Sequence, residues 1–431
     1  MPLKRILAAA AVIASLASAG ITQPAFAAGG TPGSIDTSFG HNGTAVADLG
    51  LDAAGQAKLG TPHAVIVLGN GDILVGGDLG VVRLLPTGSL DPAFGRNGYA
   101  PVGFSVANIV GLTGLTVQPD GKILWLGGTP VPNGAGGGNL NQFAVERFTA
   151  NGTPDTTFGR KGVVTTNVPT GGFGGESAQT AVVQPDGKIV VGGFTATFGR
   201  TGVSHAAPIR YHPNGSLDTS FGHGGTVIAG PGGVQAIGLD AAGDVFALPE
   251  EAEFSPAGVQ DARVAAAPIA ASTPSPQGAG NGVTDVFTFL PTGQTLAGSS
   301  VGGTVTGDTD AQVKRLKAGG TADPAFASPP IDFNGIEGVR GDSGVDSLAV
   351  QPDGKILVGG NIGLARVNAN GTLDTTFGSG AAEPRVPSTL SAVLSTSALL
   401  AVLPKAKFLA LGAGANPATG SVELILTRYF Q

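Results

Sequence analysis

The 431-residue sequence contains no cysteine, one methionine and one tryptophan, and only 12% of its residues are charged. The lack of cysteine excludes disulfide bonds, thiolate metal sites and cysteine nucleophiles. Lysine and arginine total 23 against 30 aspartate and glutamate residues, which argues against a nucleic acid or an anionic membrane as a partner. After residue 27 no apolar run reaches the roughly 18 residues that a membrane-spanning helix needs, so we expect no span in the mature protein.

Glycine and proline are abundant instead, with 73 and 30 residues. Such a content is typical of low-complexity chains when it has no period. Hydrophobic residues nevertheless make up 42% of the chain, which is too many for a disordered protein. We therefore expect the glycine and proline residues to lie in the turns of a folded, periodic structure.

The first 27 residues have the three parts of a secretory signal peptide. Lys4 and Arg5 form a basic start, residues 6–19 form an apolar stretch too short to span a bilayer, and Ala25-Phe26-Ala27 is a small-residue cleavage site. We expect a Sec-type signal peptide at 1–27, cleavage after Ala27, and a secreted or periplasmic protein. An uncleaved N-terminal anchor is the alternative.

Two independent patterns each occur seven times after the signal peptide. The first is the motif Gly-x-x-Asp, which a phenylalanine follows after three residues in six of its copies. The copies are Gly33–Asp36, Gly88–Asp91, Gly152–Asp155, Gly215–Asp218, Gly258–Asp261, Gly320–Asp323 and Gly371–Asp374. The second is a pair of apolar runs joined by a tight turn, most clearly Pro119-Asp120-Gly121, Pro185-Asp186-Gly187 and Pro352-Asp353-Gly354. Proline presets φ and glycine accepts a positive φ, so each such turn predicts a β-hairpin.

Each repeat therefore predicts four strands, a to d. Strand c ends just before the Gly-x-x-Asp motif, and strand d carries the aspartate of the motif and the phenylalanine after it, as in Asp155–Thr166. Seven repeats of about 58 residues predict an all-β fold, a seven-bladed β-propeller with four-stranded antiparallel blades, formed by residues 28–431 as a single domain. The chain begins with a d-type strand and ends with a c-type strand. We therefore expect the N-terminal strand 33–46 to pair with the C-terminal strand 422–430, to complete a three-stranded last blade and to close the ring.

Two segments carry a resemblance to a known family, Ala349–Gly360 (AVQPDGKILVGG) and Leu364–Gly378 (LARVNANGTLDTTFG). They resemble the delta-60 repeats of secreted bacterial proteins, and strands a to c are also similar to the NHL type of propeller. The resemblance covers essentially the whole mature chain. It implies a propeller and export, but it implies neither one activity nor a set of catalytic residues.

Several repeats carry an arginine five residues before the turn glycine, where a short hairpin places it opposite the motif aspartate. Arg83 and Asp91 are one such pair, and opposite charges that face each other across strands stabilise a sheet by about 0.2–1 kcal/mol. We interpret these pairs as structural. The fourth repeat places Glu253 opposite Asp261 instead, so it should form the weakest blade.

The two faces of such a propeller should differ. The a–b and c–d turns share one face, the turn face, where they are short and repetitive. The b–c and d–a connections share the other, the variable-loop face, where they differ from repeat to repeat and binding is more readily built. Strand a begins on that face, and six of its seven starting positions are polar. This predicted mouth ring consists of His63, Thr113, Gln179, Gln235, Asp285 and Asp346.

The mouth ring predicts a binding site at the centre of the variable-loop face, although strand starts that are merely solvated would show the same pattern. We expect an exported binding or interaction module, monomeric, whose ligand is an extracellular glycan, a protein or a small polar molecule. The first alternative is a propeller hydrolase or lyase in which Asp285, Asp346 and His63 hold a divalent cation at the mouth. The second is a structural envelope or matrix protein. The residues identify neither a cofactor nor a catalytic set, so enzymatic activity stays uncertain and is less favoured than binding.

Overall fold

The fold is described from a computed structural model of the 431-residue chain. It describes residues 31–49, 59–103, 110–132, 139–168, 176–196, 204–230, 233–234, 236–239, 244–248, 252–259, 286–290, 294–302, 309–317, 321–326, 328–331, 344–360, 363–377, 399–403, 406–415 and 422–431. The predicted signal peptide 1–27 lies outside these residues. Within them, no helix is long and apolar enough to cross a membrane.

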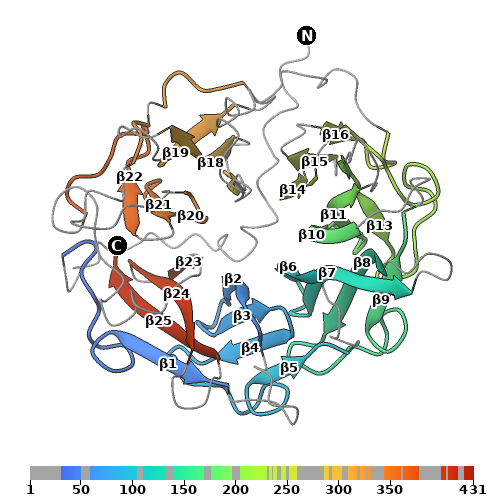
Figure 1. The fold of residues 1–431 in the computed structure, drawn as a ribbon, viewed down its shortest axis with the longest axis horizontal. Helices are drawn as coiled ribbons and strands as arrows, with labels where there is room; N and C mark the ends of the chain where they lie inside the picture. The colour runs from blue at the N-terminus through green and yellow to red at the C-terminus, as the bar shows by residue number, and fades with distance from the viewer. Residues whose placement is uncertain are drawn as a thin grey trace.

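The described strands form seven antiparallel sheets arranged around a common centre (Figure 1). We call each sheet a blade and number the blades along the chain. Blade 1 is β2 (Pro62–Val67), β3 (Ile73–Gly77), β4 (Gly80–Leu84) and β5 (Tyr99–Pro101), and blade 2 is β6 (Val110–Val117), β7 (Ile123–Pro132), β8 (Asn139–Phe148) and β9 (Val163–Thr166). Blade 3 is β10 (Glu176–Val183), β11 (Ile189–Ala196), β12 (Ser204–Ala206) and β13 (Ile209–Tyr211), and blade 4 is β14 (Ala236–Leu239), β15 (Val245–Leu248) and β16 (Ala252–Phe254).

The remaining blades complete the circle. Blade 5 is β17 (Val286–Phe289), β18 (Thr295–Gly302) and β19 (Thr309–Leu316), blade 6 is β20 (Ser347–Val350), β21 (Ile356–Gly359) and β22 (Leu364–Val367), and blade 7 is β23 (Leu399–Leu403), β24 (Lys407–Ala415), β25 (Val422–Phe430) and β1 (Thr44–Asp48). The innermost strands β2, β6, β10, β14, β17, β20 and β23 contact one another in this order and back to β2. The predicted all-β propeller class is confirmed. Blades 4, 5 and 6 have three strands each among the described residues, where four were predicted. In blade 3, β12 and β13 both pair with β11, so this blade also has three strand positions among the described residues.

The two ends of the folded chain close the ring as predicted. Strand β1 pairs antiparallel with β25 from Thr44–Thr427 to Asp48–Glu423, and the two lie side by side in Figure 1. The predicted extent of the N-terminal strand, 33–46, is wrong in detail. Before β1, residues 33–36 pair with residues 428–430 of β25 through the Ile35–Tyr429 bridge and the backbone hydrogen bonds beside it. The chain then leaves β25 and turns at Gly40 and Gly43, whose φ angles are 51° and 91°. The Gly-x-x-Asp motif therefore precedes strand d, with a turn between them, rather than forming part of it.

The core lies between blades, because each blade buries both faces against its neighbours. Phe158 of blade 2 is fully buried, and a Cβ atom on Gly215 of blade 3 would lie 3.0 Å from its ring. Gly215 has a φ of 83°, so glycine is required there both by the backbone and by this close approach. Phe94 of blade 1 packs on Gly152 of blade 2 in the same way as Phe158 packs on Gly215. Each fully buried phenylalanine contributes roughly 1.5–3 kcal/mol to folding.

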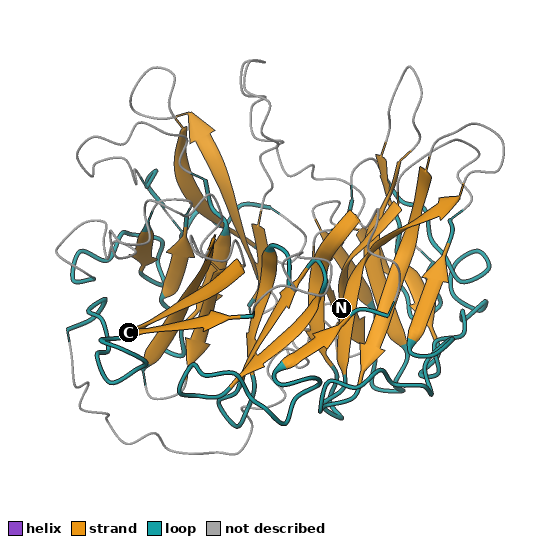
Figure 2. Cartoon of the chain, turned by 60° about the horizontal axis from the view of Figure 1, so that its bottom comes forward, coloured by secondary structure: helices purple, strands orange, loops and turns teal. Residues whose placement is uncertain are grey.

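The two faces of the ring differ in their connections. In blades 1 to 6 the a–b turn is five residues long, for example 118–122 and 184–188, and Gly121 and Gly187 each have a φ of 82°. This confirms the predicted hairpins. The b–c connections on the opposite face range from two residues (78–79) to seven (197–203). In Figure 2 the described turns gather along the lower rim of the disc.

Candidate functional site

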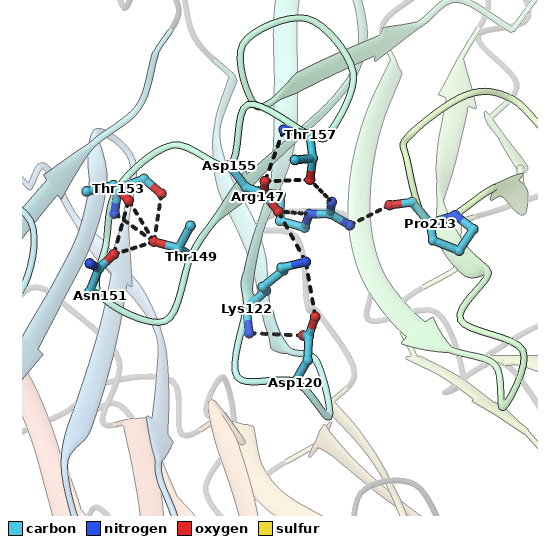
Figure 3. A network of polar contacts seen from close by, with 9 residues as sticks. All are labelled: Asp120, Lys122, Arg147, Thr149, Asn151, Thr153, Asp155, Thr157 and Pro213. Carbon is cyan, nitrogen blue, oxygen red and sulfur yellow. Dashed lines mark hydrogen bonds and ion pairs between the residues drawn. The ribbon is translucent and has the colours of Figure 1, made fainter.

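The turn face carries a polar network in each well-formed repeat, and Figure 3 shows it in blade 2. Arg147 donates from Nε to Oδ2 of Asp155 at 2.9 Å, and Lys122 of the a–b turn lies 3.4 Å from the same oxygen. The other oxygen of Asp155 accepts hydrogen bonds from the backbone N–H and the hydroxyl of Thr157. Arg147 also lies over the ring of Phe158, 4.4 Å from its centroid.

The same arginine ties its blade to the next one. Arg147 donates from Nη1 to the carbonyl oxygen of Pro213 in blade 3 at 2.6 Å. Equivalent bonds join Arg83 to Ala150, Arg210 to Pro256 and Arg315 to Ala369. The predicted cross-strand pairs are confirmed in six blades, as Arg83–Asp91, Arg147–Asp155, Arg210–Asp218, Arg315–Asp323, Arg366–Asp374 and Arg428–Asp36. The predicted contact of Glu253 with Asp261 lies outside the described residues.

Electrostatics keep these aspartates ionised. Burial by itself would raise the pKa of Asp155, but the hydrogen bonds from Thr157 and the charges of Arg147 and Lys122 lower this pKa to about 2. The same kind of surroundings holds the pKa values of Asp36, Asp218 and Asp374 well below their usual range. Because these side chains bind one another and the neighbouring blade, the recurring polar residues of the turn face are structural.

Two buried glutamates were not singled out by the sequence. Glu146 in β8 is fully buried and accepts a hydrogen bond from the backbone N–H of Gly103 in blade 1 at 2.7 Å, while its Oε1 has no partner among the described residues. Glu176 at the start of β10 accepts from the N–H of Val168 in blade 2 with both oxygens at 3.0 Å. Burial raises the pKa of each carboxyl to about 7. Both join adjacent blades and are inaccessible, so they affect stability rather than chemistry.

Three of the six predicted mouth-ring residues have described side chains. His63 in β2 is exposed, and Gln179 in β10 and Asp346 just before β20 are half-buried. Thr113 lies in β6, but only its backbone is described, and Gln235 and Asp285 lie outside the described residues. The predicted Asp285–Asp346 pair therefore stays a prediction. Among the residues that the structure does describe, no group of three or more metal-binding side chains comes together.

The mouth-ring positions of blades 1 to 3 coincide with β-bulges in the innermost strands. The pairing of β2 with β3 shifts register at His63, that of β10 with β11 shifts at Gln179, and that of β6 with β7 shifts across Thr113. A β-bulge places one extra residue in a strand and redirects its side chain, and bulges are frequent beside functional sites.

Core packing in blade 3 confirms that Gln179 is an insertion. Ala178 and Ala181 both pack into the cluster shared with blade 2, although residues three apart in a regular strand face opposite sides. Because the bulge inserts one extra residue between them, both alanines face the same side of the sheet. The mouth-ring residue of a blade can therefore vary without changing which strand residues face the core.

Blade 6 has the equivalent arrangement at Asp346. Its N–H donates to the carbonyl oxygen of Gly359 at 2.8 Å, and Gly359 also pairs with the next residue, Ser347. Two consecutive residues of the inner strand thus face one residue of β21. Asp346 also takes part in a further interaction within the protein.

His63 is the mouth-ring residue with the most defined surroundings. Its Nε2 lies 2.9 Å from Oδ1 of Asp78, which follows β3, and Oδ2 of Asp78 accepts the backbone N–H of Thr61 at 3.0 Å. The chain around this pair is held by the buried Leu59, whose carbonyl oxygen accepts the N–H of Leu79 at 2.9 Å. The sequence analysis missed Asp78, because a partner fifteen residues away becomes visible only once the short b–c turn of blade 1 is known.

Comparison with known proteins supports the fold. The family model described as a β-propeller "Domain of unknown function (DUF5122)" matches residues 66–94, 118–158, 184–221 and 351–377. These segments make up less than half of the chain, and they carry the a–b turns and Gly-x-x-Asp motifs of blades 1, 2, 3 and 6. No curated protein matches the sequence.

Solved structures with a similar arrangement include an α-L-arabinofuranosidase, Arb93A, from Fusarium graminearum (10% identity, 89% of this chain and 97% of that chain, TM-score 0.45). A gluconolactonase, XC5397, from Xanthomonas campestris is also similar (12% identity, 94% and 98% coverage, TM-score 0.38), as is a protein of unknown function from Bacteroides caccae (14%, 72% and 96%, TM-score 0.37). These identities and scores are too low to transfer an activity. The family-model match and the ring of antiparallel sheets together identify the chain as a β-propeller protein.

Proposed function

We propose that this protein is an exported β-propeller that acts as a binding or interaction module, with its ligand or partner bound on the variable-loop face. The observation that carries the proposal is a structural difference between the two faces. On the turn face the recurring charged side chains are engaged with one another and with the next blade, as in Arg147, Asp155 and Pro213. On the opposite face the connections differ in length between blades, and bulged residues such as His63 and Gln179 interrupt the inner strands.

Rigid scaffolds that carry variable connections are a common basis for binding. In this protein the hydrogen bonds between blades on the turn face make the scaffold rigid. The connections and bulged residues of the variable-loop face differ from blade to blade. A partner on this face would be an extracellular glycan, a protein or a small polar ligand. The export of residues 28–431 rests on the predicted signal peptide, and the assignment of the repeats to the delta-60 and NHL-like propellers rests on their sequence resemblance.

The absence of cysteine allows a direct orientation experiment. The mature protein is attached to a sensor surface through a single introduced cysteine, either Thr61→Cys beside the mouth ring or Asp186→Cys on an a–b turn, both at exposed positions. The probes are an array of neutral oligosaccharides and a set of extracellular proteins from the producing cells. We expect binding to protein attached through residue 186 and its loss in protein attached through residue 61.

Three outcomes would contradict the proposal. Equal binding in both orientations would place the ligand elsewhere, and binding only through the Thr61→Cys attachment would place it on the turn face. No binding in either orientation would favour a structural envelope or matrix protein. A circular dichroism spectrum of each variant serves as the control for folding.

Export is tested separately. The full chain is expressed with a C-terminal tag, and the exported protein is sequenced from its N-terminus. We expect Ala28 as the first residue. A protein that keeps Met1 or stays in the cell would overturn this part of the proposal.

A further inference from the structure

The c–d turns of blades 1 and 2 carry cations that take no part in the polar network of the turn face. Arg96 in blade 1, and Arg160 and Lys161 in blade 2, have exposed side chains. Within the described ranges of the chain, none of the three forms an ion pair or a side-chain hydrogen bond. The motif aspartates of both blades are already paired with their own arginines. These turns therefore present unpaired positive charge in a chain whose formal net charge is −7.

The backbone of the two turns has the same conformation. The N–H of Arg96 donates to the carbonyl oxygen of Tyr99 at 2.7 Å, and that of Arg160 donates to the carbonyl oxygen of Val163 at 2.8 Å. The two residues inside each turn have positive φ angles, 53° and 95° in blade 1 and 56° and 95° in blade 2, which is typical of a type I′ turn. The two arginines therefore stand at the same position of the same turn, one blade apart.

Lys161 occupies a position that the backbone does not favour for lysine. Its φ of 56° lies in the left-handed region, which glycine and asparagine adopt more readily than other residues. The equivalent residues of blades 7 and 1 are Asn42 and Asn97, with φ angles of 52° and 53°. Residues held in strained backbone conformations cluster at binding sites. The lysine adds a second charge beside Arg160 that the turn itself does not require.

Each basic turn lies against an Asn-Gly turn of the next blade. Gly95, next to Arg96, donates its N–H to the carbonyl oxygen of Asn151 in blade 2 at 2.7 Å. The exposed Asn151 side chain accepts hydroxyl groups of its own turn through Oδ1, as Figure 3 shows, while no described residue accepts from its Nδ2. The same contact recurs one blade further round, between Gly159 and Asn214 at 2.8 Å. Each boundary thus combines a cation with a neutral hydrogen-bond donor.

We propose that the basic turns, residues 94–98 and 158–162, bind an acidic polysaccharide. Carboxylate groups of one chain lie on Arg96 and on Arg160, and its hydroxyl groups lie against the neighbouring Asn-Gly turns. This surface belongs to the turn face. The inference therefore goes beyond the proposed function, whose ligand binds on the opposite face.

Charge and repetition favour this partner. A guanidinium group binds a carboxylate through two parallel hydrogen bonds. One exposed ion pair contributes little, so useful affinity requires a chain that occupies both turns at once. A polymer with acidic groups at regular intervals can do so, because the turns repeat from blade to blade. An anionic membrane matches less well, since membrane-binding segments gather about four to eight cations in one cluster and here three cations are divided between two turns.

The first test measures binding to polygalacturonate. Fragments of increasing length are titrated by calorimetry into the mature protein at low salt, beside the same fragments with every carboxyl group methyl-esterified. We expect binding of the unesterified chains alone, with an affinity that rises with chain length and falls with added salt. Affinity that does not depend on length would contradict a chain that spans two turns.

Variants identify the residues. Arg96→Gln and Arg160→Gln should each weaken polygalacturonate binding by about tenfold or more, because the chain is then held by one turn instead of two. Lys314→Gln, which removes an exposed cation of β19 in blade 5, is the matched control and should leave the affinity unchanged. An equal loss of affinity in Lys314→Gln would show that net charge alone governs binding and would overturn the site.

Lys161→Asn separates binding from folding, because it introduces the residue that blades 7 and 1 have at this position. We expect the variant to bind polygalacturonate more weakly than the wild type and to be at least as stable in urea unfolding, since the strain at this φ is relieved. Lower stability with unchanged binding would show that the lysine serves the fold, and would overturn its place in the site.

Orientation and competing anions separate this inference from the proposed function. Protein attached through Thr61→Cys should bind polygalacturonate and protein attached through Asp186→Cys should not, the reverse of the order expected for a ligand of the variable-loop face. Binding of polyphosphate or of phosphatidylglycerol vesicles without polygalacturonate would overturn the ligand class. No binding of polygalacturonate by the wild type would overturn the inference and leave the proposed function standing.

Discussion

Replacement of Glu146 by glutamine should change how the stability of the propeller depends on pH. Burial raises the pKa of this carboxyl from 4.5 to about 7, so between these values the folded protein binds a proton that the unfolded chain has released. Stability must therefore fall as pH rises through this window. A shift of about 2.5 pKa units corresponds to roughly 3 kcal/mol, since one unit is about 1.4 kcal/mol.

The assay is urea unfolding of the wild type and of Glu146→Gln at pH 5 and pH 8. The glutamine keeps a carbonyl oxygen that can accept the N–H of Gly103, but it cannot ionise. We expect the wild type to lose stability between pH 5 and pH 8, and the variant to lose roughly 3 kcal/mol less. The variant should be the more stable protein at pH 8 and comparable or less stable at pH 5.

A second variant completes the experiment. Glu176→Gln should behave like Glu146→Gln, because burial also raises the pKa of Glu176 to about 7. An unchanged pH dependence in both Glu146→Gln and Glu176→Gln would refute the reasoning.

Three more predictions concern the scaffold. Asp155→Asn breaks a buried ion pair and should lower the unfolding free energy by about 3 kcal/mol near neutral pH, as measured by urea unfolding. Because the pKa of Asp155 in the folded protein is lowered to about 2, the difference between wild type and variant should shrink as pH falls from about 4 towards 2. Gly114→Ala would place a Cβ atom 2.1 Å from the carbonyl oxygen of Gln179. The variant should lose about 1–3 kcal/mol of stability in thermal unfolding. A melting temperature equal to that of the wild type would contradict the packing of β6 on β10. Limited proteolysis should cut blade 4 first, where Glu253 is expected opposite Asp261, and a first cut in another blade would show that like charges do not decide the weak point.

The repeat architecture could be read from the sequence because its signals are local. A turn such as Pro119-Asp120-Gly121 specifies its own hairpin, and the eight-residue spacing of Arg147 and Asp155 specifies a cross-strand pair through a short turn. Ring closure followed from the order of these motifs along the chain. The limits of strand d were wrong because the motif aspartate bonds the turn residues two positions on, as Asp155 does with Thr157.

The features that define the candidate site depend on partners distant in sequence. A β-bulge at Gln179 is a property of the pairing of two strands and has no mark in one of them. The hydrogen bond between His63 and Asp78 could be recognised only from the structure of the b–c turn. Glu146 did leave a signal, because it is an acidic residue next to Arg147 in a strand that is apolar at its other positions from 143 to 148. Only its burial between two blades gave this signal a meaning.

The central claim is that the polar network of the turn face holds the propeller together while the variable-loop face binds its ligand. Its most direct measurement compares His63→Ala with Asp155→Asn for both unfolding free energy and affinity for the glycan or protein found by the orientation experiment. The account predicts that Asp155→Asn lowers stability and keeps the affinity, and that His63→Ala lowers the affinity and keeps the stability. An affinity lost in Asp155→Asn but kept in His63→Ala would contradict it.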